Sequence, residues 1–160
     1  MKALVVYDSF FGNTEQIAQA IADGVRAAGD AAEVDVVKVD QATMEMLDGL
    51  EMLVVGSPTR AFRASPNTMV FLKRVSPGAL QGVRVGAFDT RIPADESTPV
   101  ILRFLIKLFG WAAEPIGKRL TAKGGSQAAE PEGFYVTGTE GPLAEGELER
   151  AEAWGRDLAS

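Results

Sequence analysis

Patterns typical of strands and of helices alternate from end to end along this chain of 160 residues. Residues 2–7 form a near-continuous apolar run, as in a strand of a parallel sheet that is buried on both faces. In residues 13–28, Ile17, Ile21 and Val25 recur every four positions, which is the apolar stripe of an amphipathic helix. Strands joined by helices pair in parallel through right-handed crossovers, so helices cover both faces of the sheet. The alternation predicts an α/β fold, a three-layer doubly wound sandwich.

The same patterns place the other elements in one domain, residues 1–160, without an internal repeat or linker. Further strands are expected at residues 32–39, 52–56 and 83–88, and helices near 41–47, from 66 or 67 to 75, at 97–109 and from Pro142 onward. The fifth strand is expected at residues 114–120, before a glycine-rich loop and a short extended piece at 133–136. We expect a five-stranded parallel sheet in the order 2-1-3-4-5, with the ligand crevice where the winding direction reverses.

The composition excludes several kinds of chemistry. The chain has no cysteine and no histidine, which removes thiolate nucleophiles, disulfides, zinc-thiolate sites and the commonest general base. A net charge of −6 opposes nucleic-acid binding, which needs a basic surface. The longest apolar stretch, residues 99–110, is shorter than the roughly 20 residues that span a bilayer, and no secretion signal is recognisable. We therefore expect a cytoplasmic protein with neither a nucleic-acid nor a membrane partner.

A phosphate-binding loop is predicted directly after the first strand. Residues 8–14 read DSFFGNT, and the amphipathic helix begins inside this segment. Backbone N–H groups at a helix start lack internal partners, and the helix dipole favours an anion there. Ser9, Asn13 and Thr14 add side-chain donors, and Gly12 lets the backbone wrap closely around a ligand. Such residues can also serve only as helix caps, but three of them around a glycine at this junction favour a phosphate site.

Missing motifs narrow the kind of phosphate ligand. No Lys-Ser/Thr pair follows the glycine, as the Walker motif requires, and the three glycines of the dinucleotide fingerprint are absent. The third strand ends in Gly56 and Ser57 where a response regulator needs an aspartate, and low-molecular-weight phosphatases need a cysteine. Residues 5–14, which read VVYDSFFGNT, resemble the flavodoxin family, whose loop reads Ser/Thr-x-Thr-Gly-x-Thr after an apolar strand that ends in an aromatic residue.

This resemblance implies that the first loop holds the phosphate of FMN. The implied contacts come from Ser9, Phe10, Phe11, Gly12, Asn13 and Thr14. Phe11 departs from the family pattern, because a third hydroxyl is usual at its position. Loss of one hydrogen bond to a charged group costs about 1.5–3 kcal/mol. We therefore expect FMN binding to be weakened but retained.

The second loop carries a less specific resemblance. Residues 56–62, which read GSPTRAF, look like a stretch of flavodoxin-like quinone reductases in which the backbone meets the flavin edge. The implied contacts come from Ser57, Pro58, Thr59, Arg60 and Phe62. The alternatives are that Phe62 anchors the loop and that Arg60 is an ordinary surface cation.

The third loop, from residue 89, matches the family only in part. Flavodoxins usually have Gly-Asp and a second stacking tyrosine there; Asp89 matches, but the tyrosine is missing. The resemblance implies that Asp89, Thr90 and Arg91 contact the flavin, although Asp89 can equally cap a turn. Without the tyrosine, we expect a less reducing and more loosely held flavin.

Two helices have surfaces that need a partner or solvent. The helix at residues 99–109 is apolar on nearly all sides except Arg103 and Lys107, which exceeds what one sheet face can cover. We expect residues 121–133 to cover it, with a homodimer interface as the alternative. The last helix has acidic residues that either face solvent or dock a basic redox partner: Glu145, Glu147, Glu149 and Glu152. Trp154 on the same helix is expected to pack in the core.

The sequence thus favours an FMN-binding, flavodoxin-like redox protein that carries electrons between partner proteins. One alternative is an FMN-dependent NAD(P)H:quinone-type oxidoreductase, which the second loop favours. The other is a flavodoxin-fold binding module that has lost its flavin, which Phe11 and the missing stacking tyrosine favour.

Overall fold

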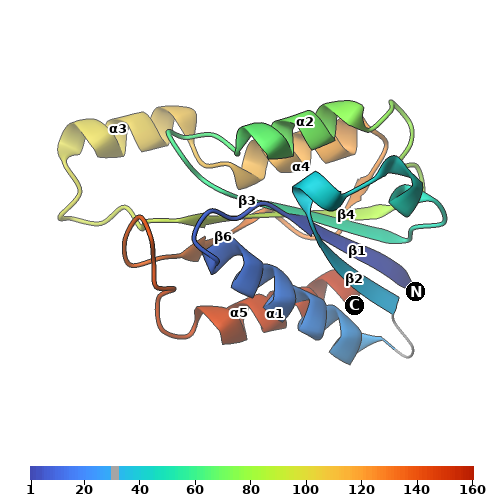
Figure 1. Cartoon of the computed structure of the whole chain (residues 1–160). Helices are drawn as coiled ribbons and strands as arrows, with labels where there is room; N and C mark the ends of the chain where they lie inside the picture. Colours follow the sequence, from blue (N-terminus) through green and yellow to red (C-terminus); the bar gives the residue numbers. More distant parts are fainter. Residues whose placement is uncertain (30–32) are drawn as a thin grey trace.

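A central sheet separates two helical layers in the computed structural model, which describes residues 1–29 and 33–160 (Figure 1). One layer consists of α1 (Asn13–Ala28) and α5 (Glu147–Ala159). The other contains α2 (Pro66–Arg74) and α4 (Ala113–Ala122). The predicted three-layer architecture is confirmed.

The described residues contain six strands, which are β1 (Lys2–Tyr7), β2 (Glu33–Lys38), β3 (Met52–Pro58), β4 (Arg84–Arg91), β5 (Ser126–Gln127) and β6 (Glu132–Tyr135). They pair in parallel in the predicted order, β2-β1-β3-β4-β5, and β6 continues along β4 beyond β5. Tyr7 lies opposite Gly56, and Gly56 lies opposite Phe88. The carboxyl ends of β1, β3 and β4 therefore meet at one edge of the sheet. Residue 32, where the second strand was expected to begin, lies outside the described residues.

The strand expected at residues 114–120 is wrong, because this segment belongs to α4. Its buried residues have the spacing of one helix face: Ala113, Ile116, Gly117 and Leu120. Pro115 lies in the first turn, where a helix tolerates proline. The fifth position of the sheet is instead divided between β5 and β6, and β6 overlaps the extended piece expected at residues 133–136.

Two expected helices also differ. In place of the helix expected near residues 41–47 there are two 3₁₀ helices, η1 (Val39–Gln41) and η2 (Met44–Leu47), because the backbone between them is extended at Ala42 and Thr43. Pro142 does not open the last helix, which begins at Glu147. The Pro142 carbonyl accepts hydrogen bonds from the N–H and the hydroxyl of Thr137, so the chain folds back there as a loop.

The two faces of the sheet bury separate apolar clusters. Phe71, Leu80 and Ile116 lie in the cluster under α2 and α4. Under α1 and α5, the rings of Phe88, Phe134 and Trp154 pack edge to face, with centres 6.1 to 6.4 Å apart. The core role predicted for Trp154 is confirmed. Close approach of α1 and α5 requires Gly155, because a Cβ there would collide with the Ile21 carbonyl.

Helix α3 (Val100–Phe109) lies in the layer of α2 and α4, toward the carboxyl ends of the strands (Figure 1). None of its residues is buried. Residues 121–133 lead from α4 into β5 and β6 and leave α3 uncovered, so the expected covering loop is wrong. Within the described part of the chain, no helix combines the length and apolarity needed to cross a bilayer.

Candidate functional site

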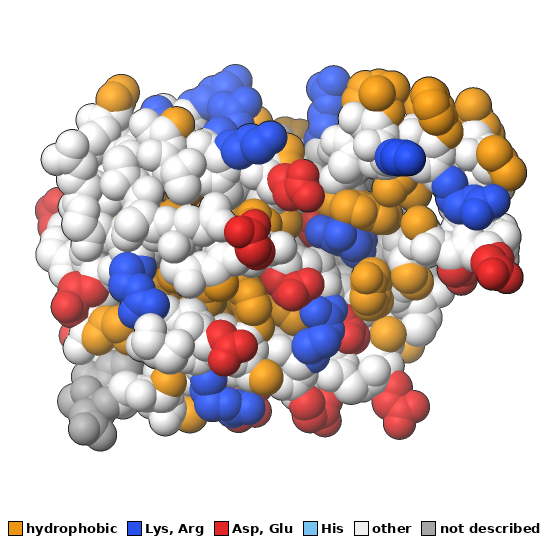
Figure 2. All heavy atoms as spheres, turned by 180° about the vertical axis from the view of Figure 1, so that it is seen from behind, with side chains coloured by type: hydrophobic (Ala, Val, Ile, Leu, Met, Phe, Trp, Pro, Cys, Tyr) orange, Lys and Arg blue, Asp and Glu red, His pale blue; other side chains and the backbone are white. Residues whose placement is uncertain are grey.

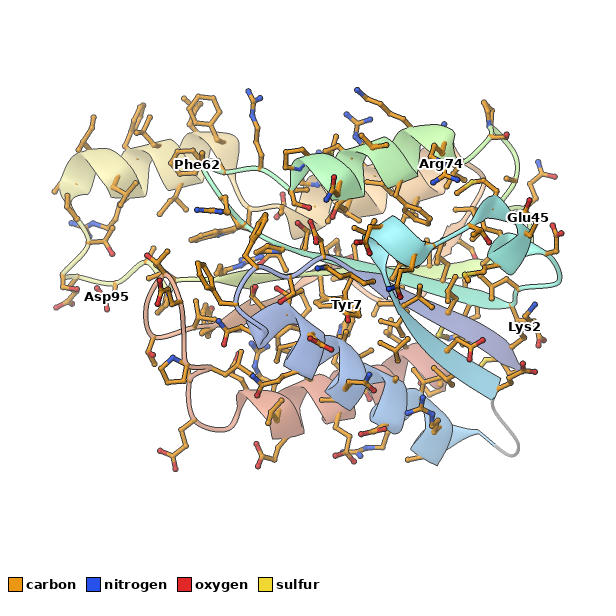
Figure 3. All side chains as sticks on the ribbon, in the orientation of Figure 1. Lys2, Tyr7, Glu45, Phe62, Arg74 and Asp95 are labelled. Atoms are coloured by element: carbon orange, nitrogen blue, oxygen red, sulfur yellow. The ribbon has the colours of Figure 1, made fainter. Side chains whose placement is uncertain are left out.

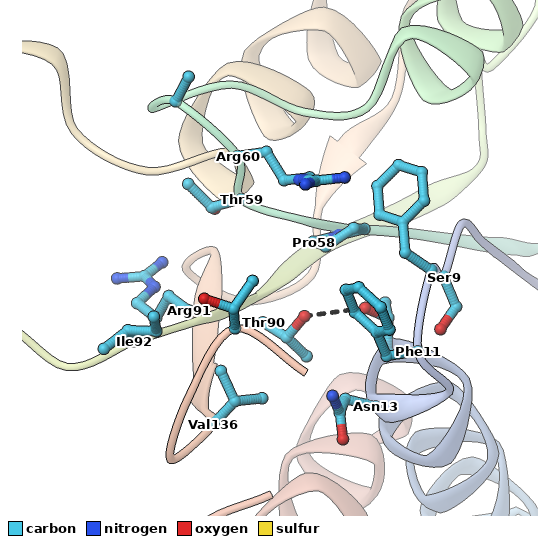
Figure 4. Close-up of a pocket in the computed structure, with 14 residues that line it drawn as sticks. Ser9, Phe11, Asn13, Pro58, Thr59, Arg60, Thr90, Arg91, Ile92 and Val136 are labelled. Carbon is cyan, nitrogen blue, oxygen red and sulfur yellow. Dashed lines mark hydrogen bonds between the residues drawn. The ribbon is translucent and has the colours of Figure 1, made fainter. Parts of the chain in front are cut away.

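A cleft of about 220 Å³ opens at the carboxyl edge of the sheet, between the segments that follow β1, β3 and β4 (Figure 4). Ten residues predicted for the site line it: Ser9, Phe10, Phe11, Asn13, Thr14, Pro58, Thr59, Arg60, Thr90 and Arg91. Four further lining residues were not predicted: Ala61, Ile92, Val136 and Thr139. The cleft therefore lies at the switch point where the doubly wound topology places ligands.

The start of α1 presents backbone donors to this cleft. Gly12 has φ 91° and precedes the helix without any side-chain cap. Among the described residues, the N–H groups of Asn13, Thr14 and Glu15 have no hydrogen-bond acceptor. Free N–H groups at the positive end of a helix dipole suit a phosphate dianion. The donor set thus fits the phosphate that the sequence predicted.

The polar side chains of the loop are held by specific partners. Ser9 Oγ accepts a hydrogen bond from the Gly12 N–H at 3.0 Å, which leaves its own hydrogen free for a ligand. The hydroxyl oxygens of Thr14 and Thr90 are 2.8 Å apart and buried, so one donates to the other (Figure 4). Asn13 Nδ2 donates to the Glu140 carbonyl at 3.1 Å. These bonds connect the first loop to β4 and to the loop after β6.

The second loop closes over the first. The N–H groups of Arg60 and Arg63 donate to each other's carbonyls at 3.0 and 2.9 Å, which forms a tight turn. The Arg60 guanidinium lies 4.8 Å from the centre of the Phe10 ring, a cation–π distance (Figure 4). Arg60 is therefore a wall of the cleft as well as an exposed cation.

Two predicted residues of this loop lie away from the cleft. Ser57 is fully buried, and its hydroxyl accepts from the Ser65 N–H at 2.8 Å and donates to the Pro58 carbonyl. The Phe62 ring lies 5.7 Å from the Phe109 ring, beside the end of α3 (Figure 3). The side chains of Ser57 and Phe62 thus stabilise the loop rather than face a ligand. In the first loop, Gly12 has no side chain and contributes only its backbone to the site.

Asp89 is also turned away from the cleft. Its carboxylate is fully buried and accepts from the guanidinium of Arg91 and, at 2.8 Å, from the Ala113 N–H at the start of α4. Burial raises the pKa of Asp89, although the bonds from Arg91 and Ala113 act in the opposite direction. The Arg91 guanidinium lies 4.6 Å from the Trp111 ring centre. Asp89 therefore orients Arg91, which lines the cleft.

Val136 and Thr139 were missed because the fifth strand was misplaced. They follow β6, whose pairing with β4 brings its carboxyl end to the same edge as the other loops. A correct assignment of residues 132–135 as the edge strand would have identified them. Nothing in the sequence pattern marks Ala61 or Ile92.

Comparisons with known proteins agree with this fold. The flavodoxin family model matches residues 5–154. The chain is 37% identical over 111 residues to an NAD(P)H dehydrogenase (quinone) of Cupriavidus metallidurans, across 56% of each chain. It is 28% identical over 169 residues to a flavodoxin of Aquifex aeolicus, across 99% of this chain and 85% of that one. The chain thus spans about half the length of the quinone dehydrogenases that it matches.

Solved structures show the same fold. An archaeal flavodoxin has a TM-score of 0.76 at 23% identity, across 99% of this chain and 96% of that chain. Flavodoxin 2 of Bacillus cereus has a TM-score of 0.78 at 23% identity, across 99% and 98%. With the family match over most of its length, the chain belongs to the flavodoxin family.

Proposed function

We propose that this protein binds FMN in the cleft and carries electrons between partner proteins. The main support for this proposal is the uncapped start of α1, where the N–H groups of Asn13, Thr14 and Glu15 have no acceptor among the described residues. A bound flavin would supply the electron transfer, and the protein would set its potential and access.

The cleft residues divide into two groups for this ligand. The hydroxyls of Ser9 and Thr14 and the free N–H groups of the first turn would hold the phosphate. The apolar and planar surfaces of Phe10, Pro58 and Ile92 would cover the flavin, and the guanidinium of Arg91 would lie at the cleft wall. The rings of Phe10 and Phe11 are about half exposed beside the cleft, where a redox partner would contact the protein.

The alignments with the relatives favour an electron carrier over a stand-alone enzyme. The flavodoxin of Aquifex aeolicus aligns with 99% of this chain, whereas the quinone dehydrogenase of Cupriavidus metallidurans aligns with 56%. The higher identity to the latter, 37%, makes an FMN-dependent NAD(P)H:quinone oxidoreductase the second candidate. NAD(P)H oxidation by the FMN-loaded protein, measured with and without a quinone, distinguishes the two: only the enzyme turns over.

The test of FMN binding is a titration of the purified protein, followed by quenching of flavin fluorescence and by the shift of flavin absorbance. Saturable quenching with one FMN per chain is expected. Absence of quenching at high FMN concentration would contradict both flavin functions and support a flavodoxin-fold binding module that takes another ligand.

A further inference from the structure

The two helical layers carry opposite charge. The helices α2, α3 and α4 have six cations and one acid: Lys73, Arg74, Arg103, Lys107, Lys118, Arg119 and Glu114. The helices α1 and α5 have six acids and three cations: Glu15, Asp23, Glu147, Glu149, Glu152, Asp157, Arg26, Arg150 and Arg156. In Figure 2, Lys and Arg side chains gather along the upper edge, which belongs to the α2–α3–α4 layer. The α-helices of this layer thus carry a net positive charge in a chain whose net charge is −6, although Asp40 and Glu45 lie on the two 3₁₀ helices beside them.

That face also has an apolar stripe on α3. Four side chains, 59 to 74% exposed, lie on one side of the helix: Val100, Ile101, Phe104 and Leu108. Figure 2 shows a hydrophobic cluster at this end of the molecule. Arg103 and Lys107 lie one turn apart beside the stripe, and neither forms a salt bridge with a described residue. Asp95 and Glu96 are the acids in the loop before α3.

We propose that the α2–α3–α4 layer docks on an anionic lipid bilayer, with the α3 stripe inserted at the boundary of headgroups and acyl chains. A helix with an apolar face flanked by cations is typical of such interfacial binding. The acidic helices α1 and α5 lie on the opposite side of the sheet, so screening by salt limits their repulsion of the bilayer.

A bilayer fits this face better than a protein does. The helix α3 projects at a corner of the molecule (Figure 1), and lipids adapt to a convex helix, whereas a protein partner needs a matching groove. A second copy of the same face would bring Arg103 and Lys107 of both copies together, which is unfavourable. The proposal departs from our expectation of no membrane partner, which rested on the lack of a span. It does not depend on flavin binding.

The test is co-sedimentation of the protein with phosphatidylcholine vesicles, with or without about one third phosphatidylglycerol. We expect salt-sensitive binding to the anionic vesicles. The double variant Phe104→Glu/Leu108→Glu should bind at least about tenfold more weakly, because both exposed side chains then oppose insertion. Arg103→Gln/Lys107→Gln should bind anionic vesicles roughly 30-fold more weakly, with little change on phosphatidylcholine alone.

The matched control is Leu148→Glu, which changes an exposed leucine on the acidic side and should leave vesicle binding unchanged. Each variant is to be checked for folding by circular dichroism before its binding is compared. Absence of binding to anionic vesicles, or equal binding by the α3 variants and the control, would overturn the proposal. The proposal would also be overturned if the protein did not bind vesicles but self-associated through α3 in sedimentation velocity. The same holds if it did not bind vesicles but bound poly-L-glutamate.

Discussion

Asp89 accepts two hydrogen bonds from the guanidinium of Arg91, at 2.6 Å from Nε and 2.7 Å from Nη2, inside the wall of the cleft. On its other sides the guanidinium meets the Trp111 ring and the backbone at Gly133, where a Cβ would collide with it. Because Asp89 is fully buried and Arg91 is 15% exposed, the ion pair holds the Arg91 side chain in a single orientation beside the cleft.

Replacement of Asp89 should therefore destabilise the fold. In Asp89→Asn, Arg91 loses its charged partner and the start of α4 loses a carboxylate acceptor. Breaking a buried ion pair from one side costs about 3–5 kcal/mol, so urea unfolding should show a loss of this size. The double variant Asp89→Asn/Arg91→Gln should lose less than the sum of the single variants. A loss below about 1 kcal/mol for Asp89→Asn would contradict a structural role for the pair.

The sequence predicts the first strand and helix of this fold better than the later elements. The bounds of β1 and α1 agree with the expected residues 2–7 and 13–28, because a β-branched run and a four-residue apolar spacing are both long and unambiguous there. In residues 114–120, Ile116 and Leu120 fit a short strand or one helix face equally well, and only the burial of Ala113 and Gly117 distinguishes them.

The site was predictable where it depends on local chemistry. The first loop, which lines the cleft, was recognisable because three small polar residues surround a glycine at a strand–helix junction. The direction of Asp89 was not predictable, because β4 was expected to end at residue 88 and continues to Arg91. Alternation in a strand sends Asp89 and Arg91 to the same side, and their pairing removes Asp89 from the cleft.

Phe11 offers a variant that should improve the proposed function. Its ring is 49% exposed beside the cleft, so Phe11→Thr removes no core side chain. The new hydroxyl adds a donor for the phosphate, and a hydrogen bond to a charged group is worth about 1.5–3 kcal/mol. Fluorescence titration should show FMN binding about tenfold tighter, with riboflavin binding unchanged. Tighter binding of riboflavin to the same extent would mean that the ring, not the missing hydroxyl, limits affinity.

Glu147 should make stability depend on acid pH. Although burial alone would raise its pKa, hydrogen bonds from Arg150 and the Tyr135 N–H lower it below the ordinary value of 4.5. A lowered pKa in the folded state stabilises the protein above pH 4.5, and this contribution is lost as pH falls through the folded-state pKa. Asp89, whose pKa is raised, acts in the opposite sense.

The effect of Glu147 is isolated by comparison with Glu147→Gln. We expect the free energy of unfolding of the unchanged protein to decrease as pH falls below 4.5, and the difference between the two proteins to shrink over the same range. Parallel pH profiles with a constant difference would show that Glu147 acts through packing alone.

The most direct test of a phosphate site at the start of α1 is the ratio of the dissociation constants for riboflavin and FMN, measured in the unchanged protein and in Thr14→Val. Thr121→Val, an exposed threonine on α4, is the matched control. We predict that FMN binds more tightly than riboflavin, and that Thr14→Val weakens FMN binding by about ten- to 100-fold while leaving riboflavin binding unchanged. Equal affinities for FMN and riboflavin in the unchanged protein, or an equal loss for both in Thr14→Val, would contradict it.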